Sequence, residues 1–349
     1  MKYGSKKISK AGSIALTSSD KNEVNNAIEM ISDWRALHLP ALDELLSSLL
    51  LLLKENKIRD FSVSRRLKRI SSILNKLDRN PKSGLGTMQD IGGLRIVVRT
   101  MDTLNKVLMV LLNNVPNNFE YTKPPINYIV SPKDISGYRS IHFVYKYHSD
   151  NKDLDGMKIE LQLRTKLQHS WAMAVETAEL ITGTALKSSQ GEEEWLTFFK
   201  VVSSLFAIKE RTPIMKEHEE KGYGMKELMT ILYQMNNNYN FNDTLKALNV
   251  TSSFAKQDNY KDGYYILSIN FETKKVKIKA FPKKNEEDAS AFYSKMEKEV
   301  EDVKNAVVLV SVPKMQQLQE AYPSYFLNTR EFLDAIDTMM HNCVKWGWV

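Results

Sequence analysis

The spacing of apolar residues predicts helices at the start of the chain, followed by a segment in which strands alternate with helices. From Ser19 to about Lys57, apolar positions recur every three or four residues, which predicts two helices broken near Pro40. Short apolar or alternating runs next predict strands at residues 61–68, 93–100, 140–148 and 156–165. Helical spacing predicts helices from Ile70, over 101–114 and over 166–181. Strands that alternate with helices indicate a mixed sheet covered by helices.

The remainder of the chain predicts a long helix and then a smaller α+β unit. The helix is expected from Glu192 to about Glu220, and the polar run at 234–243 breaks the pattern before a short helix through TLKALNV. Further strands are expected at 263–272, 274–281 and 305–312, the first two as a hairpin, with helices at 288–304, 315–321 and 330–341. The fold class is therefore α/β (α+β): a mixed-sheet domain flanked by helices, plus a small C-terminal α+β domain.

Length and composition narrow the class of protein. The chain has 349 residues, with 49 Lys and Arg against 42 Asp and Glu, a net charge of +7 and a pI near 9.1. This balance suits a phosphate-rich partner, although a basic enzyme of ordinary kind has the same composition. The single cysteine, Cys343, excludes an internal disulfide framework, and the six histidines lack metal-ligand spacing.

No apolar run reaches the roughly 18 residues that a membrane span needs, since the run from Leu42 to Lys54 is charged at both ends. That run is expected to be a buried core helix. The N-terminus lacks the apolar core of a signal peptide, so we expect a cytoplasmic protein with no membrane and no DNA partner.

The stretch KIELQLRT, Lys158 to Thr165, is the first candidate for chemistry. Alternation in a strand sends Glu160, Gln162 and Arg164 to one face and three apolar side chains to the other. The apolar face must pack against helices, which leaves the polar face available to a cleft. A half-solvated strand of an antiparallel sheet would show the same alternation.

Three other segments carry polar residues that suit a nucleotide. Asp90 precedes a glycine pair at the mouth of a strand that contains Arg95, and a carboxylate there can bind Mg²⁺ together with substrate phosphates. The loop in YIVSPKDISGYRSIHF offers cations and an aromatic ring beside a histidine, namely Lys133, Tyr138, Arg139 and His142. The segment SRRLKRISSILNKLDR places Arg66 and Lys68 on one side of an extended run, with Lys76 on the next helix. Taken singly, these are also compatible with a turn aspartate, a surface tyrosine and a solvated basic face.

Together the four segments resemble the synthetase domain of the RelA/SpoT family over about residues 60 to 185. RRLKRISSILNK is similar to the family's R-x-K-x7-K, and DIGGLRIVV to its D-I-x-G-x-R. YIVSPKDISGYRSIHF is similar to Y-I-x-x-P-K-x-x-G-Y-x-S-x-H, and IELQLRT to E-I-Q-[IL]-R-T. The family transfers the β,γ-pyrophosphate of ATP to a ribose 3′-hydroxyl.

The resemblance implies a role for each matching residue. Arg66 and Arg95 would sandwich the adenine of ATP, and Lys68 and Lys76 would hold its phosphates. Asp90 and Glu160 would coordinate Mg²⁺, and Glu160 would also polarise the attacking hydroxyl. On the acceptor side, Tyr138 would stack on the base, and the remaining contacts would come from Lys133, His142, Gln162 and Arg164. Such transfer depends on positioning and charge neutralisation, which many cations, a metal and one base provide.

Shorter stretches resemble one branch of the family, the fused toxin–antitoxin proteins of the CapRel type. These are KKISKAG, DWRALHLPAL and the run from VLVSVPK to FLDAI. Members of that branch pyrophosphorylate the 3′-CCA end of tRNA, halt translation and act in anti-phage defence. Their C-terminal domain blocks the ATP site through a Y-x-x-Y motif, matched here by Tyr322 and Tyr325, until a phage protein such as a capsid protein releases it. Core or hairpin tyrosines would fit the same letters.

The expected organisation is four units, which are N-terminal helices (1–58), the pyrophosphokinase domain (59–220), a helical connector (221–262) and the regulatory domain (263–349). Two alternatives stay open. One is a small alarmone synthetase that uses GDP, GTP or an adenine nucleotide as acceptor. The other is an inactive RNA-binding or phage-sensing module, against which the metal-binding pair Asp90 and Glu160 argues. The lysines at positions 2, 6, 7 and 10 favour tRNA through nonspecific phosphate contacts, although a flexible basic terminus would also carry them.

Overall fold

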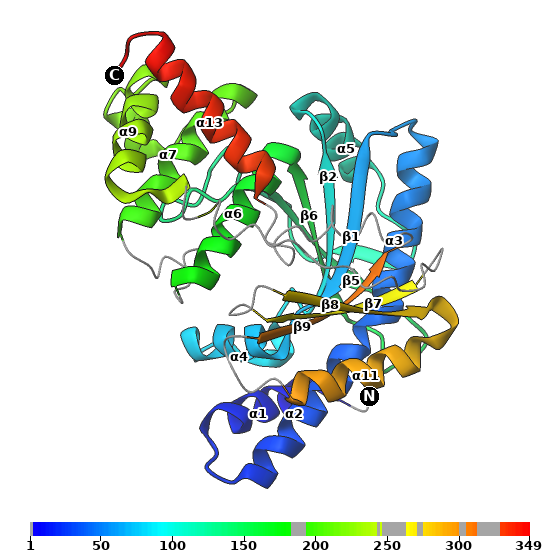
Figure 1. Cartoon of the computed structure of the whole chain (residues 1–349). Helices are drawn as coiled ribbons and strands as arrows, with labels where there is room; N and C mark the ends of the chain where they lie inside the picture. Colours follow the sequence, from blue (N-terminus) through cyan, green and yellow to red (C-terminus); the bar gives the residue numbers. More distant parts are fainter. Residues whose placement is uncertain are drawn as a thin grey trace.

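A mixed β-sheet forms the centre of the molecule (Figure 1). The computed structural model describes residues 3–182, 193–242, 245, 263–270, 275–299, 305–312 and 329–349. The sheet has nine strands in the order β3-β5-β6-β2-β1-β9-β7-β8, with β4 paired to β5. They are β1 (Phe61–Leu67), β2 (Gly92–Val98), β3 (Phe119–Tyr121), β4 (Ile126–Asn127), β5 (Ile141–Tyr147), β6 (Lys158–Thr165), β7 (Gly263–Asn270), β8 (Lys275–Pro282) and β9 (Asn305–Val312). Strands β2 and β6 are parallel and the other pairs antiparallel, which confirms the predicted class.

Helices cover the sheet and form a separate cluster beside it (Figure 1). They are α1 (Ser5–Thr17), α2 (Lys21–Ala36), α3 (His38–Glu55), α4 (Ile70–Arg79), α5 (Met101–Asn113), α6 (Lys166–Thr182), α7 (Glu193–Glu210), α8 (Lys216–Glu220), α9 (Met225–Tyr239), α11 (Glu286–Glu299) and α13 (Arg330–Lys345). Short 3₁₀ turns lie at Leu85–Thr87 and Lys283–Asn285. Of the predicted elements, the helix at 315–321 and nearly all of TLKALNV lie outside the described residues.

Alternation along the central strands creates the covered face of the sheet. Ile159, Leu161 and Leu163 of β6 have no exposed surface and belong to one core with leucines of α3 and α5. Each such side chain contributes roughly 1.5 to 3 kcal/mol by leaving water. The opposite face of β6 therefore keeps its polar residues for the site.

The N-terminal helices match the prediction, with one addition. The two expected helices are present and the break lies near Pro40: α2 ends at Ala36, and Pro40 lies in the first turn of α3, where proline costs no hydrogen bond. The basic segment before them is also helical, since α1 packs Ile8 and Ala11 against its neighbours. Its Lys6, Lys7 and Lys10 are exposed.

One helical stretch in the described residues, Lys21–Glu55, is long and apolar enough to cross a membrane by length and composition alone. In the structure it comprises α2 and α3. Leu42, Leu45, Leu49 and Leu53 of α3 are buried in the core beside the sheet, whereas Leu51 on the other side of the helix is 56% exposed. The prediction of a buried core helix therefore holds for one face only.

The predicted long helix from Glu192 to Glu220 is wrong, because it is two helices. Helix α7 ends at Glu210, where Arg211 adopts a left-handed conformation (φ +57°) and the Thr212 amide bonds back to the Ala207 carbonyl at 2.9 Å. This is a common way to satisfy the last carbonyls of a helix, and Pro213 two residues later prevents continuation. The chain restarts as α8.

A second core joins α6, α7, α9 and α13 beside the sheet. Phe332 of α13 lies against the rings of Phe198, Phe199 and Phe206 of α7, with centroids 5.9 to 6.3 Å apart. The last helix of the chain therefore packs on α7, at the upper left of Figure 1.

The C-terminal strands continue the central sheet. Strand β9 pairs with β1 at Arg65↔Ser311 and Arg66↔Val310, and β7 and β8 follow as the predicted hairpin. Helix α11 also reaches the N-terminal helices, where the Arg35 guanidinium lies 5.1 Å from the centroid of the Tyr293 ring. The proposed four-unit division remains a prediction; its last unit joins the sheet through β9 and the helical cluster through α13.

Candidate active site

Polar side chains from four neighbouring strands share the face of the sheet opposite α3. The register pairs Ser64 with Arg95, Arg95 with Gln162 and Gln162 with His142. Two residues further along β1, Arg66 pairs with Gly93 of β2, and Gly93 pairs with Glu160 of β6. Side chains that lie opposite one another in a sheet point to the same face, so the strands build one polar surface from residues far apart in sequence.

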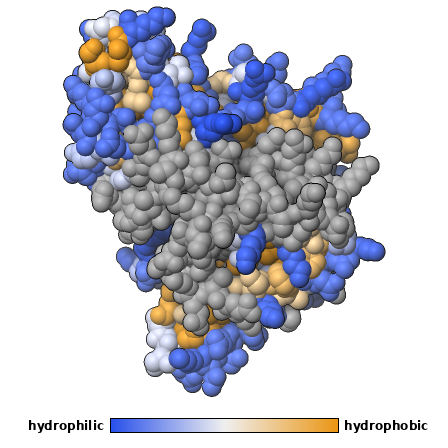
Figure 2. All heavy atoms as spheres, viewed as in Figure 1, coloured by the Kyte–Doolittle hydropathy of each residue, from blue (hydrophilic) through white to orange (hydrophobic). Residues whose placement is uncertain are grey.

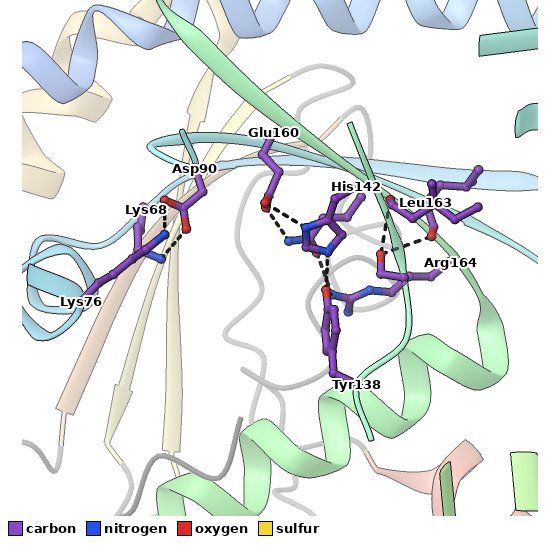
Figure 3. Close-up of polar contacts among 11 residues, drawn as sticks. Lys68, Lys76, Asp90, Tyr138, His142, Glu160, Leu163 and Arg164 are labelled. Carbon is purple, nitrogen blue, oxygen red and sulfur yellow. Dashed lines mark hydrogen bonds and ion pairs between the residues drawn. The ribbon is translucent and has the colours of Figure 1, made fainter. Parts of the chain in front are cut away.

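Two lysines neutralise Asp90 on one side of this surface, and we call the three residues the donor cluster after their predicted role. The Lys68 and Lys76 ammonium groups each lie 3.0 Å from a different carboxylate oxygen of Asp90 (Figure 3). Lys68 directly follows β1 and Asp90 precedes β2, so the antiparallel pairing of these strands brings them together, while α4 supplies Lys76. The three groups form a compact site of net positive charge that suits a polyphosphate.

A hydrogen-bonded chain of side chains lies on the other side, and we call it the acceptor cluster after the role predicted for its residues. The Glu160 carboxylate lies 3.0 Å from His142 Nδ1 and accepts a bond of 2.7 Å from Gln162 Nε2. His142 Nε2 lies 2.7 Å from the Tyr138 hydroxyl. Arg164 donates to that hydroxyl and, at 2.7 Å, to Gln162 Oε1. Figure 3 shows Glu160 pointing toward His142, with Asp90 on the other side of the gap between the two clusters.

A cleft of about 620 Å³ contains both clusters. This volume lies within the usual range of roughly 300 to 1,000 Å³ for small-molecule sites. Its lining includes eight Lys and Arg side chains against three carboxylates, Asp90, Glu160 and Glu176. The cations are Arg66, Lys68, Lys76, Arg79, Arg95, Lys123, Lys133 and Arg164. A smaller adjoining hollow of about 50 Å³ shares five of these lining residues and adds Gly93.

Gly93 forms part of that hollow because it has no side chain. A Cβ built on it would meet only the Arg66 carbonyl oxygen, at 3.8 Å, so the backbone has room for a small side chain. The position lies between Arg66 and Glu160 in the register. A large side chain here would fill the hollow between the donor and acceptor clusters.

All the catalytic, ATP-binding and acceptor residues predicted from sequence line this cleft. Arg139, singled out beside them, does not; it is 3% exposed and points to α7. The autoinhibitory pair Tyr322 and Tyr325 lies outside the described residues. Sequence reasoning missed Arg79, Lys123, Tyr128 and Glu176 as lining residues. Two of these residues lay in quoted stretches, because Tyr128 begins YIVSPK and Arg79 ends SRRLKRISSILNKLDR.

Tyr138 lies in the cleft wall rather than across its opening. It is only 7% exposed, with Lys133 Nζ 5.1 Å and Arg164 Cζ 4.9 Å from the ring centroid. The partly exposed Tyr128 ring lies at 70° to it, with centroids 5.9 Å apart. Stacking of Tyr138 on an acceptor base stays a prediction, and it requires the Lys133 side chain to move off the ring.

Charges and burial set the protonation of the site. Burial alone would raise the pKa of Glu160, but hydrogen bonds and charge from His142, with help from Gln162 and Lys76, lower it to about 2. Burial acts in the same direction on Asp90, yet Lys68 and Lys76 hold its pKa below the ordinary value. Burial lowers the pKa of Lys68 and of Lys133 and raises that of the Tyr138 hydroxyl. Both carboxylates are therefore ionised at neutral pH.

The donor set fits a magnesium ion that arrives with a nucleotide. Asp90 and Glu160 line the same hollow, and Mg²⁺ is commonly bound by one or two carboxylates plus substrate phosphates. Among the described residues no group of three or more His, Cys, Asp or Glu side chains forms a metal site of its own. Asp90 and Glu160 would hold the ion, which would neutralise phosphate charge when bound.

Comparison with known proteins finds a family to which this part of the chain is similar. Residues 65–180, which contain all the catalytic, ATP-binding and acceptor residues named above, match the model of the region found in RelA / SpoT proteins. Over this segment the chain is similar to that family, as the four motifs predicted. The fused toxin–antitoxin branch stays a prediction.

Individual relatives match part of the chain. GTP pyrophosphokinase YjbM of Bacillus subtilis (strain 168) is 36% identical over 115 residues, which are 32% of this chain and 52% of that protein. The chain thus spans about half the length of this relative. A GTP pyrophosphokinase family protein from Streptococcus pneumoniae has a TM-score of 0.42 and 22% identity over 51% of this chain and 88% of its own. Small alarmone synthetase 1 from Bacillus subtilis bound to its product pppGpp has a TM-score of 0.42 and 24% identity, and the match covers 54% of this chain and 93% of that protein.

Proposed function

We propose that the protein is an ATP-dependent pyrophosphotransferase whose active site is the cleft between β1, β2, β5 and β6. The observation that carries the proposal is the pairing of two clusters in one hollow, Lys68–Asp90–Lys76 on one side and Glu160–His142–Tyr138 on the other. A cationic site for a polyphosphate beside an ionised carboxylate is the inventory that phosphoryl-type transfer requires. The match to the RelA/SpoT region supports the same activity.

The reaction would transfer the β- and γ-phosphates of ATP together. The oxygen of an acceptor hydroxyl attacks the β-phosphorus, the bond from that phosphorus to the α–β bridging oxygen breaks, and AMP leaves with the electron pair. Lys68 and Lys76 neutralise charge on the phosphates. Glu160 orients the hydroxyl and takes its proton late in the transfer, because a carboxylate whose pKa is about 2 is a weak base.

The acceptor we favour is the 3′-CCA end of tRNA, which would make the protein a toxin that stops translation. Two features support an acceptor longer than a nucleotide. Arg79 and Lys123 are exposed at the cleft, beyond the two lysines on Asp90. Helix α1 presents Lys6, Lys7 and Lys10 to solvent. Exposed cations of this kind bind nucleic-acid backbones without sequence preference.

A second acceptor class, GDP or GTP, is favoured by the name of the 36% identical relative, a GTP pyrophosphokinase. The cleft residues would serve either acceptor, because a base and a ribose hydroxyl are common to both. An adenine nucleotide is the third choice. An inactive RNA-binding or phage-sensing module would have no use for a partly exposed Asp90 that two lysines hold in the cleft.

Regulation by the C-terminal region completes the proposal. The region would restrain the transferase through Tyr322 and Tyr325, and a phage protein such as a capsid protein would release it. The pairing of β9 with β1 at Arg66 supports this idea, since Arg66 lines the cleft. One or two ring contacts, worth roughly 0.5 to 2 kcal/mol each, would suffice for a switch that a trigger can reverse.

An acceptor assay tests the function. The full chain and a form without the C-terminal region are incubated with γ-labelled ATP and either deacylated tRNA or GDP. Label on the tRNA 3′ end supports the toxin, and label on guanosine nucleotide supports the alarmone synthetase. Absence of label from both forms with every acceptor refutes the transferase.

A further inference from the structure

The acceptor-side loop, residues 133–139, is held in a closed turn. The Gly137 amide donates to the Lys133 carbonyl at 2.8 Å, and the Lys133 amide donates to the Tyr138 carbonyl at 3.2 Å. Gly137 has a φ of +78°, which a residue with a side chain rarely adopts. Tyr138, at the end of this turn, carries the hydroxyl that contacts His142. The backbone of the loop therefore sets where that hydroxyl lies.

Helix α7 fastens this loop through one side chain. The Ser203 hydroxyl donates to the Gly137 carbonyl at 2.6 Å and accepts from Arg139 Nε at 2.9 Å. Ser203 is 2% exposed and Arg139 is 3% exposed, so water does not replace these bonds when they are lost. A Cβ on Gly137 would lie 2.9 Å from the Ser203 Cβ, which shows how closely the loop rests on the helix.

We propose that Ser203 is a positioning residue for the acceptor. It does not line the cleft itself, but it fixes both residues that flank Tyr138. Helix α7 also lies beyond the matched region 65–180, so the match does not assign it a role. The consequence for catalysis rests on the proposed transferase function, because it is expressed through acceptor binding.

The effect passes from the helix to the reacting group by short contacts. Without the Ser203 hydroxyl, the Gly137 carbonyl and Arg139 Nε each lose the bond that holds them to α7. The loop can then lift, which misaligns the bond of 2.7 Å from Tyr138 to His142 and, beyond it, the contact of 3.0 Å from His142 to Glu160. The donor cluster on Asp90 is held by its own two ion pairs and keeps its geometry.

The next residue on the helix provides a matched control. Ser204 is buried like Ser203, but its hydroxyl accepts a hydrogen bond from the Met215 amide at 3.0 Å and forms another with His218 Nδ1 at 2.8 Å. Ser204→Ala removes the same atom from the same helix and loosens α8 instead of the loop. Any effect that is merely structural should appear in both variants.

The experiment compares Ser203→Ala with Ser204→Ala in the full chain by two readouts. Hydrogen exchange of residues 133–139 should be faster in Ser203→Ala and unchanged in Ser204→Ala. Steady-state kinetics of the full chain should show kcat/KM for the acceptor about tenfold lower in Ser203→Ala, which corresponds to about 1.4 kcal/mol. The KM for ATP should stay within about twofold in both variants.

Equal loop exchange and equal acceptor kinetics in the two variants would overturn the proposal. Hydrogen exchange is measured without substrate, so it tests the hold of Ser203 on the loop even if the wild type transfers to no acceptor. Absence of transfer by the wild type would refute the proposed function and leave the exchange result unaffected. If Ser203→Ala does not fold, Arg139→Lys, which removes the Nε donor, takes its place with the same expected readouts.

Discussion

Replacing Glu160 by glutamine removes a negative charge from the acceptor side of the reacting centre while keeping the shape of the side chain. Among the described residues, Glu160 has close polar contacts of 3.0 Å to His142 Nδ1 and 2.7 Å to Gln162 Nε2. A glutamine retains one acceptor oxygen for these two partners. It cannot take a proton from a hydroxyl, and it balances the surrounding cations less well.

The magnitude follows from these losses. Removing a positioned base or one electrostatic stabiliser costs about 10²- to 10⁴-fold in rate, or about 3 to 5 kcal/mol of transition-state stabilisation. The fold should survive, because native domains are stable by roughly 5 to 15 kcal/mol. A glutamine at position 160 can also still accept the hydrogen bond from Gln162 Nε2. We expect kcat to fall by at least two orders of magnitude with every acceptor, while circular dichroism stays that of the wild type.

Glu120→Gln is the matched control. Like Glu160, Glu120 contacts a histidine, at 3.3 Å to His148, and it also pairs with Lys146 at 2.9 Å; its side chain is exposed and lies on β3 outside the cleft. Exposed pairs of this kind contribute little to stability. The transfer rate of the Glu120→Gln variant should equal that of the wild type. Retained activity in Glu160→Gln, or an equal loss in Glu120→Gln, would remove Glu160 from the mechanism.

Three further predictions concern the donor hollow, the pH dependence of stability and autoinhibition. Gly93→Ala should fold and bind ATP nearly as the wild type does, whereas Gly93→Leu should raise the KM for ATP at least tenfold by filling the space beside Arg66; equal KM values would show that the hollow is not used. The pKa of Glu160 is depressed from 4.5 to about 2, so its contribution, up to about 3 kcal/mol, is present above pH 4.5 and lost as the pH falls toward 2. Urea unfolding of wild type and Glu160→Gln should therefore converge over that window, and a constant difference would contradict the shift. Tyr322→Ala should make the full chain toxic on expression, with the half-exposed Tyr239→Ala as control, and unaffected growth would end the autoinhibition proposal.

Local patterns in the sequence predicted the strands and helices that line the cleft well, for a physical reason. Strand β6 alternates apolar and polar residues because one face packs in the core and the other lines the cleft, so the alternation alone assigns Glu160, Gln162 and Arg164 to one face. The helix α4 likewise buries Ile70, Ile73 and Leu77. A periodic pattern of apolar residues indicates which face of an element is buried. It predicts these elements correctly because each has one apolar face that packs in the core.

Non-local pairing was beyond the same reasoning. The sequence of β9 does not indicate that this strand pairs with β1. The sequence of α13 likewise does not indicate that this helix packs on α7. Strands β3 and β4 are three and two residues long, too short to show a period. Lys123 lines the cleft only because the chain after β3 meets α4 there, so its role could not be read from spacing. Arg79, by contrast, lies three residues after Lys76 on the same face of α4.

The most direct test of the central claim is the ratio of AMP formed to label transferred. The full chain and the form without its C-terminal region are incubated with γ-labelled ATP and each acceptor, and adenine nucleotides are separated while labelled acceptor is counted. Transfer of a pyrophosphate through the cleft predicts one AMP for each labelled acceptor and neither product in Glu160→Gln. ADP that appears in step with the label would show transfer of a single phosphate and contradict the account.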